Sequence, residues 1–430
     1  MPKIWFVFPT LNRYQTARFK ACLKAGLDAG VIEISRMGSY PIPGWRSPEA
    51  DRLADVVTLF DDLYFGQIST IDLKERMEKE LAKHKNSIDA LAILGWGNRE
   101  ANVAHAWALR NQVPCVLLSE STEQDRSRSR IGEWVKRKLV AGFDSALVGG
   151  GEHLRYLQKL GFSVDRISFG YNAVDNQYFV DGATSVRGNP AGHRHELGFD
   201  GPFFLCACRM VSQKNLALLL DAYSKYRQRC TGDGPENGAG HHGDASESLP
   251  AANPWPLVIL GDGPLRESLL AQRSSLGLDH CVHFPGVKNY DEMPSYYGLA
   301  GAFVLPSQSE PWGLVVNEAM ASGLPVLVSN RCGCCSEIVR DGVNGFTFRP
   351  DDPAQLAQLM GEVSISIDRA NLMGQASLEI ISQWGPARFS DGLRRAFQQA
   401  RESQSAKGSI VLQALLLMRL LATSKAGLIK

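Results

Sequence analysis

The sequence predicts an α/β protein made of two doubly wound domains. Three observations lead to this class: a length of 430 residues, short apolar runs that alternate with longer amphipathic stretches, and a restart of that alternation near residue 200. Continuous apolar runs suit parallel strands that are buried on both faces. Two such domains facing each other would leave a cleft between the carboxyl edges of their sheets, where open α/β folds bind ligands.

The first half contains apolar runs followed by stretches with helical spacing. The N-terminal run, which ends at Phe8, is expected to be the first strand because it is too short for the apolar region of a signal peptide. The expected strands are residues 3–8, 56–60, 88–94, 115–118 and 145–148, and the expected helices are residues 16–29, 73–85, 100–111 and 132–140.

The second half repeats the pattern. A glycine-rich turn, residues 261–264, ends one of its strands, and Gly323 is expected to close a helix at the position after its last turn. The expected strands are residues 202–208, 257–260, 281–284, 302–305 and 325–329, and the expected helices are residues 216–229, 264–275, 291–297 and 314–322.

Composition excludes several classes of protein. Lys plus Arg is 46 and Asp plus Glu is 45, so the net charge of +1 gives no sign of a nucleic-acid binder. Nine cysteines are too few for a disulfide scaffold in a chain of this length, which favours a reducing, cytoplasmic setting. No apolar run approaches the ~18 residues of a transmembrane helix.

Three segments stand outside the strand–helix pattern. Residues 181–200 have little hydrophobic pattern, so we place the domain boundary there, with a first domain over 1–185 and a second over 200–384. Residues 231–254 are rich in Gly, Ala, Ser and Glu and are expected to be a flexible surface insertion, in which His241 and His242 are expected to be incidental. The tail, 406–430, has an apolar stretch too short to span a bilayer; it could pack on the body, bind a partner or lie on a membrane surface.

Several phosphate-binding and catalytic signatures are absent. The turn after the first strand has no glycine, no P-loop motif occurs, and no Gly-x-Ser-x-Gly elbow follows a strand. A dinucleotide-binding protein, a P-loop kinase and an α/β-hydrolase are therefore disfavoured. The run Cys332-Gly333-Cys334-Cys335 has no second cysteine pair, so we expect structural thiols and no zinc site.

Two cations follow the first strand of the second half. Arg209 comes directly after that strand, and Lys214 comes just before the next helix. Cations at the carboxyl edge of a parallel sheet, beside helix N-terminal N–H groups, suit a diphosphate ligand. Two ordinary surface cations remain the alternative.

Two glutamates follow a later strand. Glu310 lies in a loop with Pro311 and Gly313, and Glu318 follows eight residues later inside a helix. The helix N-terminus can hold phosphate, while the carboxylates can accept hydrogen bonds from hydroxyl groups on either side of it. Glu318 sits among apolar residues, so its carboxylate needs a partner. The pattern suits a ligand with a sugar, a diphosphate and a ribose.

At these residues the chain resembles a known family. The stretch from Ser309 to Val326 is similar to the signature of retaining, nucleotide-sugar-dependent glycosyltransferases of family 4, including the Glu-x7-Glu motif formed by Glu310 and Glu318. Further similar segments, found through most of the second half, are residues 209–215, 261–264, 284–286, 337–339 and 341–345. The first half resembles the family more loosely, at Gly95-Trp96, at residues 119–121 and at residues 170–176.

The resemblance implies a GT-B fold, namely two Rossmann-like domains with the active site in the cleft, and residues 385–405 crossing back onto the first domain. It implies a nucleotide-diphosphate sugar as co-substrate, retention of anomeric configuration, and no cofactor or metal. It implies catalytic roles for Arg209, Lys214, Glu310 and Glu120. It implies donor contacts at Glu318, Trp312, Gly313, Leu314, Val315, Gly263, Pro285 and Val287.

Two departures from the family pattern occur in the first half. Many members carry a Gly-Gly loop after the first strand, where this chain has Leu11-Asn12-Arg13, and many carry a histidine where this chain has Glu120. These departures concern the phosphate contact from the first domain and the polar group on the acceptor side. His105, on an expected helix, is predicted to be a packing residue.

The predicted function is transfer of a hexose to a saccharide or lipid-linked acceptor in polysaccharide or glycoconjugate synthesis. A nucleotide-sugar epimerase of the same architecture and a non-catalytic nucleotide-sugar-binding protein are the alternatives. Six cations between residues 126 and 138 are either a solvated helix face or a contact with an anionic membrane or a lipid-phosphate acceptor. The expected location is cytoplasmic, peripheral on the inner face of the membrane.

Overall fold

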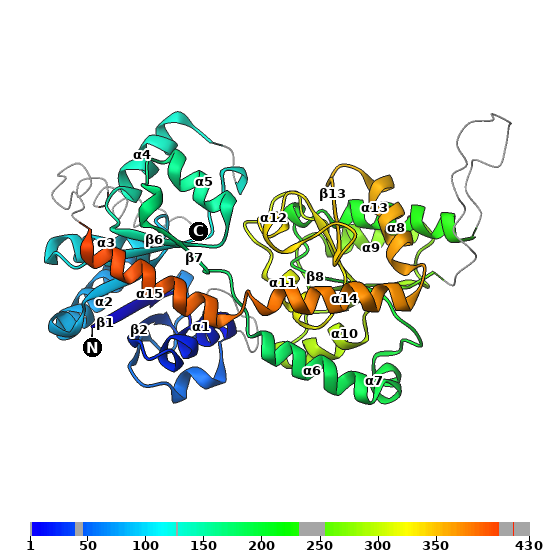
Figure 1. The fold of residues 1–430 in the computed structure, drawn as a ribbon, viewed down its shortest axis with the longest axis horizontal. Helices are drawn as coiled ribbons and strands as arrows, with labels where there is room; N and C mark the ends of the chain where they lie inside the picture. The colour runs from blue at the N-terminus through cyan, green and yellow to red at the C-terminus, as the bar shows by residue number, and fades with distance from the viewer. Residues whose placement is uncertain (1, 39–45, 126–127, 232–253, 404–415, 417–430) are drawn as a thin grey trace. The chain divides into compact units, whose positions relative to one another are not determined.

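The structure is a computed structural model that describes residues 2–38, 46–125, 128–231, 254–403 and 416. The chain divides into two compact units (Figure 1). Unit 1 comprises Met1–Asp175 and Trp384–Lys430, and unit 2 comprises Asn176–Gln383. The insertion predicted over 231–254 and the tail predicted over 406–430 lie outside the described residues, apart from residues 231, 254 and 416.

Unit 1 is built on a seven-stranded parallel sheet in the order β3-β2-β1-β4-β5-β6-β7. Its strands are β1 Lys3–Phe8, β2 Asp28–Ser35, β3 Val56–Phe60, β4 Ala90–Leu94, β5 Cys115–Ser119, β6 Ser145–Val148 and β7 Ile167–Phe169. Its helices are α1 Arg13–Lys24, α2 Thr70–His84, α3 Arg99–Asn111, α4 Arg130–Val140, α5 Gly151–Lys159 and α15 Pro386–Glu402.

Helices cover both faces of this sheet. Residues of α1 and α15 share one buried cluster, and residues of α2, α3, α4 and α5 share the other (Figure 1). Leu416 is 1% exposed and belongs to the second cluster. Of the three alternatives for the tail, packing on the body therefore holds at this residue.

The helix expected over residues 16–29 is wrong at its C-terminal end. The helix ends at Lys24, a glycine turn with φ of +75° at Gly26 follows, and β2 begins at Asp28. The sequence pattern missed this strand because Gly30 and Glu33 interrupt its apolar run. Gly30 is needed there, since a Cβ atom would lie 2.8 Å from the ring of Trp5 on the neighbouring strand. The segment containing α5 and β7 was also not predicted.

Unit 2 is built on a six-stranded parallel sheet in the order β10-β9-β8-β11-β12-β13. Its strands are β8 Phe204–Ala207, β9 Leu257–Leu260, β10 Val282–Gly286, β11 Ala302–Leu305, β12 Val326–Ser329 and β13 Gly345–Phe348, the last of which was not predicted. Its helices are α6 Asn176–Gly188, α7 Pro190–Leu197, α8 Leu216–Thr231, α9 Arg266–Ser275, α10 Met293–Leu299, α11 Leu314–Ala321, α12 Cys335–Ile338, α13 Pro353–Ser364 and α14 Ile367–Ser382.

The segment placed at the domain boundary, residues 181–200, is largely helical and belongs to unit 2. The ring of Phe179 on α6 meets the ring of Tyr297 edge-on at 5.7 Å. The Arg187 guanidinium donates to the carbonyl oxygens of Gly298 at 3.1 Å and Ser322 at 2.7 Å. The sequence suggested a linker because Gly, Pro and His dilute the hydrophobic pattern, but a few large residues attach these helices to the unit.

Candidate functional site

At one place in the unit 2 sheet, two neighbouring strands are followed by connections that lead to opposite sides of the sheet. From β8 the chain continues through β9 and β10 toward one side of the sheet, whereas β11, β12 and β13 extend toward the other. The carboxyl ends of β8 and β11 therefore lie side by side at a topological switch point, where open α/β sheets bind ligands. The two most informative sequence segments, residues 209–215 and 307–314, follow these two strands.

An ion pair joins these two loops. Lys214 ends the short 3₁₀ helix Ser212–Lys214, and its Nζ pairs with Oε2 of Glu310. The two side chains are 16% and 15% exposed, so the pair is mostly shielded but open to a ligand. Ser307 Oγ donates to the same carboxylate at 3.5 Å. Two residues 96 positions apart in the chain are thus brought together.

Asn215 fixes the position of the Lys214 loop. Its φ of +55° is left-handed, a conformation that asparagine tolerates better than most residues. Its amide donates to the carbonyl oxygens of Pro306 at 3.2 Å and Pro350 at 2.8 Å, and it accepts from the Gln308 amide at 3.2 Å. The resemblance covered Asn215, but only the structure gives it this bracing role. The signal in the sequence was an asparagine directly before a helix.

Arg209 follows β8 and is exposed. Among the residues that the structure describes, no carboxylate pairs with it. The glycine turn after β9 packs against its backbone: Met210 N donates to Asp262 O at 2.8 Å, and a Cβ on Gly263 would lie 2.6 Å from Met210 O. Gly263, with φ of +156°, must therefore be glycine for this close approach.

The Glu310 loop is held from its other side by the cysteine segment. Gly333 N donates to Glu310 O at 2.9 Å, Glu310 N donates to Arg331 O at 3.2 Å, and Cys334 N donates to Trp312 O at 3.3 Å. Burial raises the pKa of the Cys332 and Cys334 thiols well above the usual range, so both are neutral. Within the described part of the chain no cluster of metal-ligating side chains forms, and all nine cysteines are free thiols.

Helix α11 begins where the Glu310 loop ends. Gly313 precedes it with φ of +98°, and Trp312 is 2% exposed with its indole N–H donating to Asn317 Oδ1 at 2.8 Å. Leu314 and Val315, the next predicted donor contacts, are half-buried in the first turn. The buried indole anchors the loop, so the helix N-terminus has a fixed position beside the Lys214–Glu310 pair.

Glu318 lies further along α11, and the hydrogen-bond partner expected for its carboxylate is present. The side chain is 3% exposed, and the Tyr297 hydroxyl donates to its Oε2 at 2.8 Å. Sequence reasoning identified the need for a partner but not Tyr297, because the contact crosses from α10 to α11.

The remaining predicted donor contacts lie on the loop after β10. Pro285 is half-buried and Val287 is 54% exposed. Gly261 N donates to Gly286 O at 2.9 Å, so this loop is joined to the Gly261–Gly263 turn.

Glu120 belongs to unit 1, directly after β5, and is half-buried. Burial raises the pKa of Tyr171 to about 12, and the nearby Glu120 carboxylate adds to that rise. His105 packs as predicted, 2% exposed and stacked on Phe143 at 4.0 Å, and burial lowers its pKa to about 4. Sequence reasoning missed Glu100 in the first turn of α3, where burial raises the pKa to about 7.

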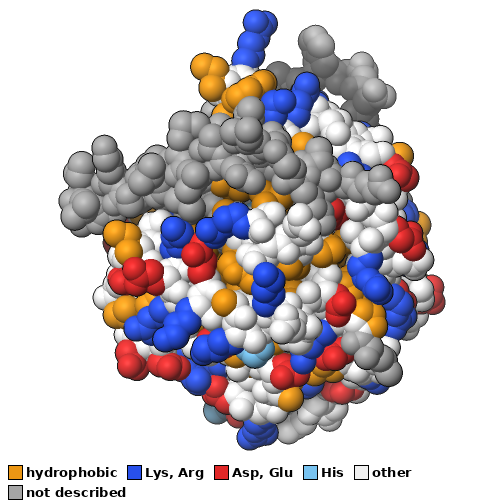
Figure 2. All heavy atoms as spheres, turned by 90° about the vertical axis from the view of Figure 1, so that its left-hand side faces the viewer, with side chains coloured by type: hydrophobic (Ala, Val, Ile, Leu, Met, Phe, Trp, Pro, Cys, Tyr) orange, Lys and Arg blue, Asp and Glu red, His pale blue; other side chains and the backbone are white. Residues whose placement is uncertain are grey.

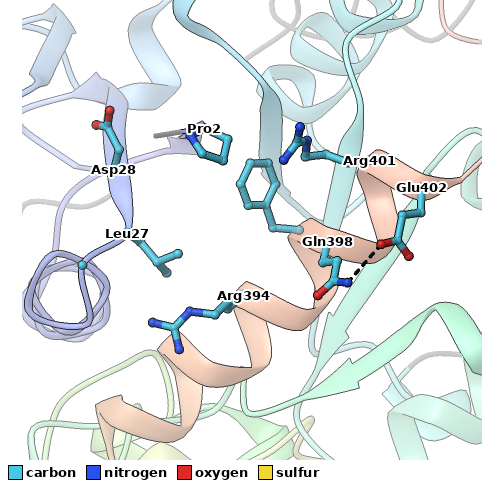
Figure 3. A pocket seen from close by; sticks show the side chains of 9 residues that line it. Pro2, Leu27, Asp28, Arg394, Gln398, Arg401 and Glu402 are labelled. Atoms are coloured by element: carbon cyan, nitrogen blue, oxygen red, sulfur yellow. Dashed lines mark hydrogen bonds between the residues drawn. The ribbon is translucent and has the colours of Figure 1, made fainter.

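An open cavity of about 620 Å³ lies elsewhere in unit 1, at the amino ends of β1 and β2. Figure 3 shows Arg394 and Arg401 projecting from α15 beside the space that Pro2 and Leu27 line, while the Gln398 amide donates to Glu402 Oε1 at 3.0 Å. It is on the sheet edge opposite to the strand ends that carry Glu120, and none of the predicted site residues lines it.

The family comparison covers most of unit 2. Residues 193–377 match the sequence model of the glycosyl transferases group 1. Over these residues, which make up most of unit 2, the chain matches this family. The motif-based recognition of a family 4 glycosyltransferase is confirmed at this level.

Two curated relatives extend the likeness. The D-inositol 3-phosphate glycosyltransferase of Nocardia farcinica is 31% identical over 318 residues, which are 71% of this chain and 64% of the relative. A GDP-mannose-dependent alpha-(1-6)-phosphatidylinositol monomannoside mannosyltransferase of Mycobacterium tuberculosis is 30% identical over 213 residues, 47% of this chain and 49% of the relative. The aligned part of the chain thus spans about half the length of the second relative.

Solved structures confirm the fold. Anabaena HepE in complex with UDP and glucose has a TM-score of 0.68 at 17% identity, covering 92% of this chain and 98% of that one. Sucrose-phosphate synthase from Thermosynechococcus elongatus has a TM-score of 0.67 at 17% identity, covering 93% and 99%. The expected pair of doubly wound α/β units, the GT-B class, is confirmed.

Proposed function

We propose that this group 1 glycosyltransferase moves a hexose from a nucleotide-diphosphate sugar to a saccharide or lipid-linked acceptor, with retention of configuration and without a metal. The observation that carries the proposal is the Lys214–Glu310 pair at the switch point of unit 2, with Arg209 nearby at the end of β8. This pair is mostly shielded from solvent but remains accessible to a ligand. It offers one cation for a departing phosphate and one carboxylate for sugar hydroxyls.

The two cations take the role that a divalent ion has in other transferases. Negative charge builds up on the leaving diphosphate as the glycosidic bond to it breaks. Lys214 and Arg209, at the same sheet edge, are placed to stabilise that charge together with the N–H groups at the start of α11. Binding of the diphosphate would draw Lys214 from Glu310 and release the carboxylate for the sugar.

Glu318 is proposed to bind the ribose. The Tyr297 hydroxyl donates to its Oε2 at 2.8 Å and so orients the buried carboxylate that is proposed to accept from a ribose hydroxyl. The base is proposed to lie along the loop that contains Pro285 and Val287, whose exposed side chain offers an apolar contact. Glu120 of unit 1 is the proposed polar group on the acceptor side.

The relatives guide the choice of substrates to test. The names of the mannosyltransferase and the inositol-phosphate transferase make GDP-mannose and a phosphoinositol acceptor the first pair, and HepE adds UDP-glucose as a second donor. We place the reaction in polysaccharide or glycoconjugate synthesis at the cytoplasmic side of a membrane. Thermal-shift measurements against GDP-, UDP- and ADP-sugars would identify the base.

The test is transfer of labelled sugar by Lys214→Ala and Glu310→Gln, with Lys225→Ala as a matched control because Lys225 is exposed on α8. Each site variant should lose at least ~100-fold in turnover while its melting curve still shows a folded protein. Near wild-type turnover in both would refute the site. NMR of the product should show the donor's anomeric configuration, and EDTA should leave the rate unchanged; strict dependence on Mn²⁺ would contradict the metal-free mechanism.

A further inference from the structure

Helix α4 of unit 1 presents a face that none of the described residues of the unit covers. Ile131 is 79% exposed and Trp134 is 49% exposed. Arg130, Arg137 and Lys138 are also exposed. Positions 130, 131, 134, 137 and 138 fall on one side of a helix with 3.6 residues per turn. We call these five residues the outer face of α4.

The opposite side of the helix attaches it to unit 1. Leu139 and Val140 are buried in the core. Glu133, the acidic residue of the helix, accepts from Lys136 Nζ at 2.8 Å and from the Tyr156 hydroxyl at 3.1 Å. Arg128, just before the helix, donates to the same hydroxyl at 2.7 Å. The Glu133 carboxylate therefore contacts the body of unit 1, and the outer face carries no negative charge.

The two sides of α4 divide the described members of the six cations between residues 126 and 138 into two groups. Arg128 and Lys136 are held by the Tyr156–Glu133 contacts, and Arg126 lies outside the described residues. Arg130, Arg137 and Lys138 remain on the outer face, and none of them pairs with a carboxylate in the part of the chain that the structure describes. Lys138 Nζ lies 5.9 Å from the centre of the Trp134 ring. At the top of Figure 2, the end of unit 1 that carries α4 in Figure 1, orange and blue side chains protrude next to one another.

We propose that the outer face of α4 docks unit 1 on an anionic lipid bilayer. Cations attract acidic headgroups, and an exposed tryptophan and isoleucine between them enter the boundary between headgroups and acyl chains. Arg137 also donates to Lys159 O at 3.1 Å, but none of the three cations has a carboxylate partner among the described residues. A protein partner with an apolar groove would not need three such cations around the two apolar side chains. The charge pattern therefore favours the lipid surface.

The position of α4 in the sheet of unit 1 indicates what docking would achieve, an argument that rests on the proposed function. In a parallel sheet the connecting helix runs opposite to its strands, so α4, which joins β5 to β6, begins at the carboxyl edge of the sheet. Ile131 and Trp134 lie in its first turns, at the same edge as Glu120. Docking there would bring a lipid-linked acceptor to the edge of unit 1 that is proposed to receive it.

The test is co-sedimentation of the full-length chain with vesicles of phosphatidylcholine alone or mixed with phosphatidylglycerol. Wild-type protein should bind the mixed vesicles and lose binding as salt rises. The triple variant Arg130→Gln, Arg137→Gln, Lys138→Gln should bind about 100-fold more weakly. The control triple, Lys79→Gln, Lys85→Gln, Lys225→Gln, removes the same charge from exposed positions elsewhere and should bind as wild type does.

Insertion is tested separately by the double variant Ile131→Ser, Trp134→Ser, with Ile71→Ser, which is 65% exposed on α2, as its control. The emission of Trp134, obtained by difference from Trp134→Phe, should shift to shorter wavelength when anionic vesicles are added. Equal binding by variants and controls, or no emission shift, would overturn the proposal. A concentration-dependent dimer that the Ile131→Ser, Trp134→Ser variant abolishes would also overturn it and assign the face to a second copy of the chain.

Transfer to a water-soluble acceptor separates this proposal from the function itself. The α4 variants touch none of the proposed catalytic residues, so they should retain wild-type turnover on that acceptor. Loss of vesicle binding with intact soluble turnover supports the docking face. Vesicle binding through α4 in a chain without any transfer activity would contradict the proposed function and leave the docking face standing.

Discussion

Replacing Glu100 by glutamine should stabilise unit 1 at alkaline pH. Glu100 is 2% exposed in the first turn of α3, and burial raises its pKa from 4.5 to about 7. In the unfolded chain this carboxyl ionises near pH 4.5, so the folded form holds the proton over a range in which the unfolded form has lost it. Stability is therefore lost as pH rises between these two values and stays lower above the second one.

The magnitude follows from the size of the pKa difference. A rise from 4.5 to about 7, at 1.36 kcal/mol for each pH unit, corresponds to about 3 kcal/mol at pH ~8 and only about 1 kcal/mol at pH ~5. Glutamine keeps the shape and removes the ionisation. For a unit of this size, about 3 kcal/mol corresponds to a rise in Tm of roughly 6–12 °C.

The assay compares melting curves of wild type and Glu100→Gln at both pH values, followed by circular dichroism. Glu152→Gln is the control, because Glu152 also lies in the first turn of a unit 1 helix but is 39% exposed. It corrects for the loss of a favourable acid at a helix N-terminus. A Tm difference that is the same at both pH values, or absent at pH ~8, would refute burial of an ionisable carboxyl at this position.

Three further outcomes are expected. The contribution of His105 to the stability of unit 1 should fall as pH falls from about 6.5 to 4, because the folded chain keeps His105 neutral while the unfolded chain binds the proton; the Tm difference between wild type and His105→Gln should change over that range, with a sign opposite to the change caused by Glu100. Gly263→Ala should cost at least ~2 kcal/mol in urea unfolding and weaken nucleotide binding, whereas Gly277→Ala, with open space around its Cβ, should cost only ~1 kcal/mol. Tyr297→Phe should cost about 1–3 kcal/mol and lower nucleotide affinity in calorimetry, because Glu318 loses its hydroxyl donor; unchanged affinity would argue against a ribose contact there.

Local pattern was enough to predict most of the buried strands. Residues 3–8, 56–60 and 145–148 are mostly apolar runs, and each forms the strand that was expected. The pattern failed at β2, where a glycine that accommodates Trp5 and the buried Glu33 break the run. Glu33 is buried because Arg46 and Thr58 donate to it at 2.9 and 2.8 Å, partners that lie elsewhere in the chain.

The same limit applies to the site. Motif spacing identified Lys214, Glu310 and Glu318, and the fold joins the first two as a pair. Motif spacing could not identify Tyr297 or the contacts of Asn215, because each contact joins elements that are distant in the sequence. The proposed role of α4 also depends on the structure, which shows which cations of this segment already contact Tyr156 and Glu133.

The strand order of unit 2 makes its site a reporter of complete folding. Two three-stranded arms extend outward from the β8–β11 junction, and the Lys214–Glu310 contact closes that junction across 96 positions of sequence. A nascent chain that has emerged only as far as β10 contains both cations but lacks the carboxylate, Gly313 and α11. Nucleotide-sugar binding would then appear during synthesis only after the second arm has joined the first, so a growing chain could not hold its donor prematurely.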